Sequence, residues 1–212
     1  MVIFCYYQSM TLLSTYQTAY ITTAVVASAI VIILIVILLY RNFYESKHLR
    51  ELTYLKLYRL SNHNDYLLLN AYRINIDDKH VAFIDHILIS KKFIILINDF
   101  SISGVISGDF QSDELANTKK KGTDIIANPL NLNINLTKRL ALFTGLNQSF
   151  LKGLVVINND SNIKVDNMNK QFQIIKRKEL PKTIRAFDKE DVKNLNEDSV
   201  VKFINFLNEH NN

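Results

Sequence analysis

The sequence predicts an α/β fold in which an N-terminal transmembrane helix precedes a mixed sheet that is flanked by helices. Three observations lead to this prediction. Residues 21–40 form an apolar run without a charge, residues 83–90 and 93–97 form two strand-like apolar runs, and strand-like and helical patterns alternate after residue 128. A series of strands followed by such an alternation is typical of a sheet with helices packed against it.

The apolar run from Ile21 to Tyr40 predicts a membrane-spanning helix. At about 1.5 Å per residue it spans ~30 Å, the thickness of a hydrocarbon core. Tyrosines flank it on both sides, as in interfacial aromatic belts: Tyr16, Tyr20, Tyr40 and Tyr44. A cleavable signal peptide is the alternative interpretation. It is disfavoured because no basic region precedes the run and no polar segment follows Ala27-Ser28-Ala29.

Charge on the two sides of this run predicts the orientation. Residues 1–40 contain no Asp, Glu, Lys, Arg or His, so the whole net charge of +5 lies in the rest of the chain. Basic residues crowd the C-terminal side: Arg41, Lys47, Arg50, Lys56 and Arg59. The positive-inside rule therefore predicts a single-pass cell-membrane protein with its N-terminus outside and its C-terminal domain in the cytoplasm. Frequent Asn, Ile and Lys indicate an AT-rich, bacterial source.

Five regions are expected along the chain. They are a short extracytoplasmic tail (1–18), the transmembrane helix (19–40), a juxtamembrane helix (41–62), an α/β domain (63–180) and a C-terminal helical segment (181–212). The juxtamembrane helix should cover one face of the sheet, because its leucines recur at spacings of three and four residues.

Within the α/β domain the patterns predict a strand meander followed by helices. Four strands are expected at 66–74, 82–90, 92–98 and 104–107, and residues 111–127 are expected to form a polar loop. A helix should follow from Pro129 to Phe143, with Asn128 as its N-cap and Gly145 at its end. Further strands are expected at 153–157 and 172–175.

Polar groups at the ends of the two apolar runs mark the candidate site. Asp85 lies at the start of the first run, and Asn98-Asp99 follow the second. A weaker candidate, for contacts with nucleic-acid phosphates, is a run of three lysines: Lys119, Lys120 and Lys121. An ordinary solvated loop is the alternative there. The five histidines are scattered and the single cysteine is Cys5, so no zinc site is predicted.

Several of these segments together resemble the nuclease-related domain (NERD) family. They are Ile84-Asp85-His86-Ile87-Leu88-Ile89-Ser90, Ser103-Gly104-Val105-Ile106-Ser107-Gly108-Asp109 and Asn128-Pro129-Leu130, with the later apolar strands in the same order. The resemblance covers roughly residues 45–180. It implies a restriction-endonuclease-like fold and a role in DNA processing.

The resemblance also implies a particular chemistry. One strand supplies an aspartate, and the next supplies an acid and a lysine separated by one residue, which places both on the same face. The two carboxylates hold Mg²⁺, which lowers the pKa of a bound water and shields the phosphate charge, while the lysine positions the water.

This chain departs from that pattern. Asp85 matches the family aspartate, but an alignment without a gap places Asn98 at the acid position and Phe100 at the lysine position. A two-residue insertion would place Leu96 and Asn98 there instead. Leu132 stands where the family often has a glutamine. Asp99 is a weak substitute for the acid, because in a regular strand it points to the opposite face unless a β-bulge re-aims it.

The sequence therefore predicts a membrane-anchored pseudoenzyme: a non-catalytic NERD-like module that binds nucleic acid or a protein partner and needs no cofactor. Two alternatives stay open. The first is a divergent nuclease in which Asp85 and Asp99 use Mg²⁺ to cut DNA. The second is a membrane scaffold that self-associates through its membrane helix. The expected partners are the lipid bilayer and, according to the alternative, DNA or RNA, a protein, or a second copy.

Overall fold

The computed structural model describes residues 2–77, 80–166 and 168–210. The chain forms two compact units, Met1–Tyr44 and Glu45–Asn212. Met1 of the expected N-terminal tail and the last two residues of the expected C-terminal segment lie outside the described residues.

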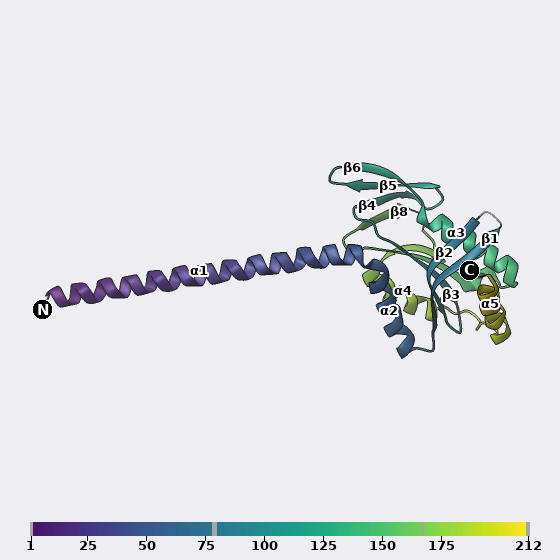
Figure 1. Ribbon diagram of the computed structural model, residues 1–212, viewed down its shortest axis with the longest axis horizontal. Coiled ribbons are helices and arrows are strands. Elements are labelled where there is room, and N and C mark those ends of the chain that lie inside the picture. Colours follow the sequence, from purple (N-terminus) through teal and green to yellow (C-terminus); the bar gives the residue numbers. More distant parts are fainter. Residues whose placement is uncertain (1, 78–79, 167, 211–212) are drawn as a thin grey trace. The chain divides into compact units, whose positions relative to one another are not determined.

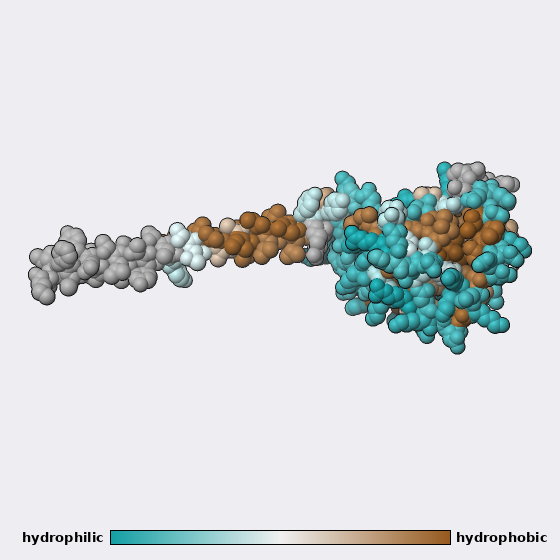
Figure 2. Space-filling view, turned by 90° about the horizontal axis from the view of Figure 1, so that it is seen from below, coloured by the Kyte–Doolittle hydropathy of each residue, from teal (hydrophilic) through white to brown (hydrophobic). Residues whose placement is uncertain are grey.

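Helix α1 (Val2–Lys47) makes up the first unit and continues for its last residues into the second. Its segment Tyr20–Glu45 is long and apolar enough to cross a membrane, by length and composition. The side chains from Ile30 to Leu39 are between 50% and 65% exposed. Apolar residues cover this segment on the face seen in Figure 2.

The second unit is built around a five-stranded sheet, sheet A, in the order β1-β2-β3-β7-β9. Its strands are β1 (Leu67–Asp77), β2 (His80–Ile89), β3 (Ile94–Phe100), β7 (Leu151–Ile157) and β9 (Phe172–Lys176). The first three are antiparallel neighbours, as the alternating apolar runs predict, whereas β7 and β9 run parallel to β3. All seven residues of β7 are buried, as expected for a central parallel strand.

Helices cover both faces of sheet A (Figure 1). They are α2 (Leu49–His63), α3 (Pro129–Thr144), α4 (Leu180–Asp188) and α5 (Glu197–His210). Leucines of α2 and apolar residues of α4 pack on one face, so α2 covers the sheet as predicted. Apolar residues of α3 and α5 pack on the other face. The result is a mixed α/β architecture.

Sheet B has four strands in the order β6-β5-β4-β8. They are β4 (Val105–Asp109), β5 (Glu114–Lys119), β6 (Gly122–Ala127) and β8 (Asn162–Asp166). Two sequence predictions are wrong here. The strand at 104–107 does not extend the meander of sheet A, and most of the expected loop at 111–127 is the β5–β6 hairpin, residues 114–127.

The two sheets are linked by paired strands. β3 lies beside β7 in sheet A, and their continuations β4 and β8 lie side by side in sheet B, again parallel. Gly104 lies at this corner with φ +116, a backbone conformation that side chains with a Cβ rarely adopt. A Cβ there would lie 2.6 Å from the carbonyl oxygen of Thr118. The bend that separates the sheets therefore depends on this glycine.

The predicted helix after residue 128 is confirmed together with both of its ends. The Asn128 side chain accepts a hydrogen bond from the Leu130 N–H, and Pro129 stands at the first helical position. The amide of Asn128 also donates to the carbonyl oxygens of Phe110 and Ser112. Gly145 ends the helix in the left-handed conformation. One asparagine thus fixes the start of α3 against the β4–β5 connection.

Candidate functional site: the Asp85–Asp99 network

Asp85 lies in β2 and is 8% exposed. Its Oδ1 accepts from Nε of Arg50 on α2 at 2.9 Å, and its Oδ2 accepts from the backbone N–H of Asp99 at 2.9 Å. The guanidinium of Arg50 also lies 4.6 Å above the centre of the Phe83 ring. Both carboxylate oxygens of Asp85 therefore have donors within the protein.

Asp99, near the end of β3, is the centre of a second set of contacts. Its side chain is 4% exposed. Oδ2 lies 2.9 Å from Nε2 of His86, and Oδ1 accepts from the Thr53 hydroxyl at 2.6 Å. Nδ1 of His86 lies 2.7 Å from Oδ1 of Asn70 in β1. Strands β1, β2 and β3 and helix α2 thus supply a closed polar network beneath the helix.

The regular alternation of side chains along β2 is interrupted at this site. Asp85 and His86 are consecutive, yet both reach groups on the α2 side of sheet A. Opposite Asp85 in the β1–β2 register stands Ala71, whose φ of 58° is in the left-handed region. This distortion brings Asp85 to the face that Asp99 occupies. The two carboxylates therefore share one side of the sheet, because the irregularity lies in β1 and β2 rather than in β3.

Burial raises the pKa of Asp85 above its usual value. The hydrogen bond from the Asp99 backbone opposes this shift, the Asp99 carboxylate adds to it, and Arg50 and His86 oppose it. A group whose pKa is raised in the folded state binds its proton more tightly there than in the unfolded chain. The contribution of Asp85 to stability is therefore fully present below the unfolded pKa and is lost as pH rises through the folded pKa.

Asp85→Asn should consequently reduce the pH dependence of stability. The amide oxygen of the substituted side chain can still accept from the Asp99 N–H, but the side chain cannot ionise. As pH is raised from about 3 to about 7, the unfolding free energy of the variant minus that of the wild type should increase, because only the wild type loses stability when Asp85 ionises. Urea unfolding at several pH values measures this difference. A constant or shrinking difference would show that the ionised form of Asp85 is not disfavoured in the folded protein.

Asn98 and Phe100, to which the alignment without a gap assigns the acid and the lysine, lie on either side of Asp99. Extending the β2–β3 register by one pair places Asp85 opposite Asn98. The Asn98 amide donates to the Phe83 carbonyl at 2.8 Å. Phe100 packs against an apolar cluster that includes Ile106 and Leu130. The position that the alignment without a gap assigns to the lysine thus carries a phenyl ring in apolar surroundings.

The remaining motif positions are apolar as well. Leu96, the acid position of the alternative alignment, is fully buried in the core between β3 and the α3–α5 layer. Leu132 on α3 is 42% exposed. Neither side chain can bind a metal ion or position a water molecule.

The donors around Asp85 and Asp99 do not fit a Mg²⁺ site. Mg²⁺ binds carboxylate oxygens that face it, together with several waters. Here each of the four carboxylate oxygens has a donor from the protein, and one of these donors is a guanidinium. Among the residues that the structure describes, no group of three or more His, Cys, Asp or Glu could hold a metal ion.

The lysines predicted as phosphate contacts lie at the tip of the β5–β6 hairpin. Lys119 ends β5, whereas Lys120 and Lys121 form the turn itself, and all three are exposed. The lysines are thus solvated, at a tight turn between two strands rather than in a long loop. Nζ of Lys119 lies 3.2 Å from Oδ2 of Asp124, so an acid on the same hairpin partly offsets their charge. The hairpin belongs to sheet B and Asp85 to sheet A, so the structure does not unite the two predicted sites.

Sequence reasoning missed Arg50, Thr53 and Asn70 as partners of the two aspartates. A signal was present in α2, where Arg50, Thr53 and Leu57 are spaced to lie on one face. Arg50 and Thr53 lie on the same helix face as the buried Leu57, and polar residues on a buried face indicate a polar partner in the sheet beneath the helix. Nothing in the sequence of β1 marks the conformation of Ala71.

Comparison with known proteins places these residues in a family context. The model of the nuclease-related domain family matches residues 46–158, which include α2, both aspartates and β7. No curated protein and no solved structure matches the chain.

Proposed function

This chain belongs to the nuclease-related domain family, whose model covers more than half of it, and on that basis we propose that it is a membrane-anchored, non-catalytic module that binds nucleic acid. The proposal includes a restriction-endonuclease-like fold for residues 63–180 and a cytoplasmic location for them. Its domain boundaries are those expected from the sequence.

The proposal that the module is non-catalytic is supported by the carboxylates of Asp85 and Asp99, whose oxygens all accept hydrogen bonds from the protein. In a metal-dependent nuclease the acids must be free to hold a cation that faces the substrate. In this chain Arg50 supplies the positive charge beside Asp85, while His86 and Thr53 occupy Asp99. Phe100 leaves the site without a lysine. A family scaffold whose acids serve internal contacts is suited to binding rather than to hydrolysis.

The membrane anchor is supported by the surface of α1. Side chains that are apolar around the helix and at least half exposed are unfavourable in water but match a hydrocarbon core. Lys47 and the cationic side chains of α2 follow the apolar segment, and under the positive-inside rule they favour a cytoplasmic second unit.

The binding and cleavage claims can be tested on the full chain in nanodiscs of phosphatidylcholine. Labelled single-stranded and duplex DNA and RNA should stay intact with Mg²⁺ or Mn²⁺, and should bind with an affinity that falls as salt is raised. Cleavage that Asp85→Asn abolishes would overturn the non-catalytic claim. An absence of both cleavage and binding would overturn the nucleic-acid claim and favour a protein partner.

The orientation is tested with a single cysteine in the second unit. In a Cys5→Ser background, Gln111→Cys places a thiol on the exposed β4–β5 connection. A membrane-impermeant maleimide should label it only after the cells are permeabilised. Labelling of intact cells would instead place the domain outside.

A further inference from the structure

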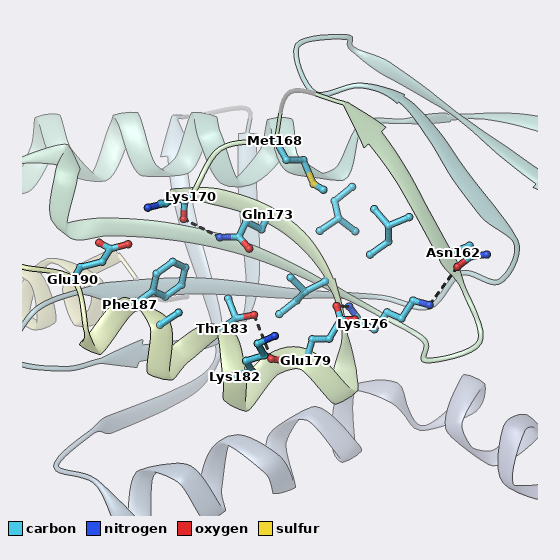
Figure 3. Close-up of a pocket in the computed structure, with 14 residues that line it drawn as sticks. Asn162, Met168, Lys170, Gln173, Lys176, Glu179, Lys182, Thr183, Phe187 and Glu190 are labelled. Atoms are coloured by element: carbon cyan, nitrogen blue, oxygen red, sulfur yellow. Dashed lines mark hydrogen bonds between the residues drawn. The ribbon is translucent and has the colours of Figure 1, made fainter.

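A groove of about 660 Å³ lies in the second unit between β9, β8 and α4 (Figure 3). Its apolar floor includes Ile163, Met168 and Ile174. The volume is within the range of about 300–1,000 Å³ that is usual for small-ligand sites. It can therefore take in one or two nucleotide units of a single strand, but not a segment of duplex.

The groove follows the free edge of sheet A. β9 is the last strand in the sheet order, and β7 occupies only one of its sides. An edge strand presents backbone N–H and C=O groups that pair with whatever extended chain lies beside it. The N–H groups at the two ends of β9 are bonded to side chains, that of Phe172 to Asn169 and that of Lys176 to Glu179. Strand β8 and helix α4 line the groove beside this edge.

The charge of the lining favours an anion. Lys170, Lys176 and Lys182 line the groove from the loop before β9, from its end and from the first turn of α4. Lys170 and Lys182 are exposed, and Nζ of Lys176 lies 3.4 Å from the neutral amide oxygen of Asn162. Two glutamates also line the groove. Glu190 is paired with the buried Lys152 at 2.8 Å, and Glu179 accepts from the backbone N–H of Lys176 at 3.2 Å. Three lysines therefore outnumber the two glutamates, one of which is neutralised by Lys152.

We infer that this groove is the binding site for single-stranded nucleic acid, an inference that rests on the proposed function. The three lysines would contact successive phosphates, while the apolar floor would receive the bases. The hairpin tip carries the same number of lysines. However, Lys119 is paired with Asp124 there, and the tip does not line the groove. The groove therefore offers the better match to a polyanion with apolar bases.

The test compares two triple variants that remove equal charge. One is K170Q/K176Q/K182Q in the groove, and the other is K119Q/K120Q/K121Q at the hairpin tip. Full-length protein in phosphatidylcholine nanodiscs is titrated into a labelled oligothymidylate of about 12 nucleotides at several salt concentrations. The salt slope of log affinity should fall by about 2 in the groove variant, since each phosphate contact on a single strand contributes about 0.7. It should be unchanged in the hairpin variant.

Two further variants guard against an effect on folding. Lys170→Gln and Lys182→Gln alone change exposed side chains, and each should lower the slope by about 0.7. The triple lysine-to-arginine variant of the groove keeps the charge and should keep the slope.

The different failures are distinguishable. If the wild type binds and only the hairpin variant loses slope, the groove inference is wrong while the proposed function stands. If the wild type does not bind any nucleic acid, the proposed function itself fails. If decaglutamate displaces the oligonucleotide at equal charge concentration, the groove recognises acidic peptides, and the inference is overturned.

Discussion

Replacing Asp99 with alanine should lower the free energy of unfolding by about 2–4 kcal/mol, because it leaves buried donors without an acceptor. The Asp99 side chain is 4% exposed and the His86 side chain 3% exposed, so water cannot replace the lost contact. Thr53 retains its bond to the Leu49 carbonyl, and the loss is therefore concentrated on His86.

Urea unfolding of the full chain in detergent, followed by near-ultraviolet circular dichroism, measures this effect. Asp124→Ala is the matched control, since it removes a carboxylate that pairs with Lys119 on the exposed hairpin. That control should change stability by no more than about 0.5 kcal/mol. Equal losses in the two variants would mean that the Asp99 network contributes no more than a surface ion pair.

Replacing Phe203 with alanine should destabilise the domain by about 3–5 kcal/mol, the usual cost of removing a buried aromatic ring. Phe203 and Leu207 on α5 are both 0% exposed and belong to the core cluster that includes Ile84 and Leu140. The matched family segment ends at residue 158, so this variant tests whether the later residues are part of the same domain.

The matched control for Phe203 lies on the same helix. Val201 is 54% exposed, and Val201→Ala should change the unfolding free energy by less than about 0.5 kcal/mol. Urea unfolding of the Phe203→Ala variant should remain a single transition at lower denaturant. A separate early transition with an unchanged main one would indicate that α5 is an appendage.

The first sheet was largely predictable from the sequence, and the second was not. The central strands of sheet A are buried on both faces, so their apolar runs are continuous and easily recognised. In sheet B one face is open to solvent, and β6 carries Ile125 at 63% exposure. Its hairpin is therefore polar and resembles a loop. β8 is short and charged, and it is a strand only because β4 lies beside it.

The site shows the same division between local and long-range information. The strands that carry Asp85 and Asp99 could be placed from the apolar pattern, because side chains alternate along each strand. The partners of the carboxylates could not, since Arg50 and Thr53 come from a helix that lies far away in sequence. Strict alternation also predicts that Asp85 and His86 face apart, and the backbone at Ala71 removes that alternation.

The pairing of β3 with β7 affects how this protein folds while it is being synthesised on the ribosome. Ile94 of β3 pairs with Leu151 of β7, and β7 pairs with β9. Sheet A therefore cannot be completed until most of the chain has been synthesised. Until then the apolar β3 presents an open edge to other nascent chains. Such distant pairings also slow folding, toward the range of milliseconds to seconds. The most vulnerable state of this molecule is therefore its unfinished chain, when the meander exists and the strand that completes it does not.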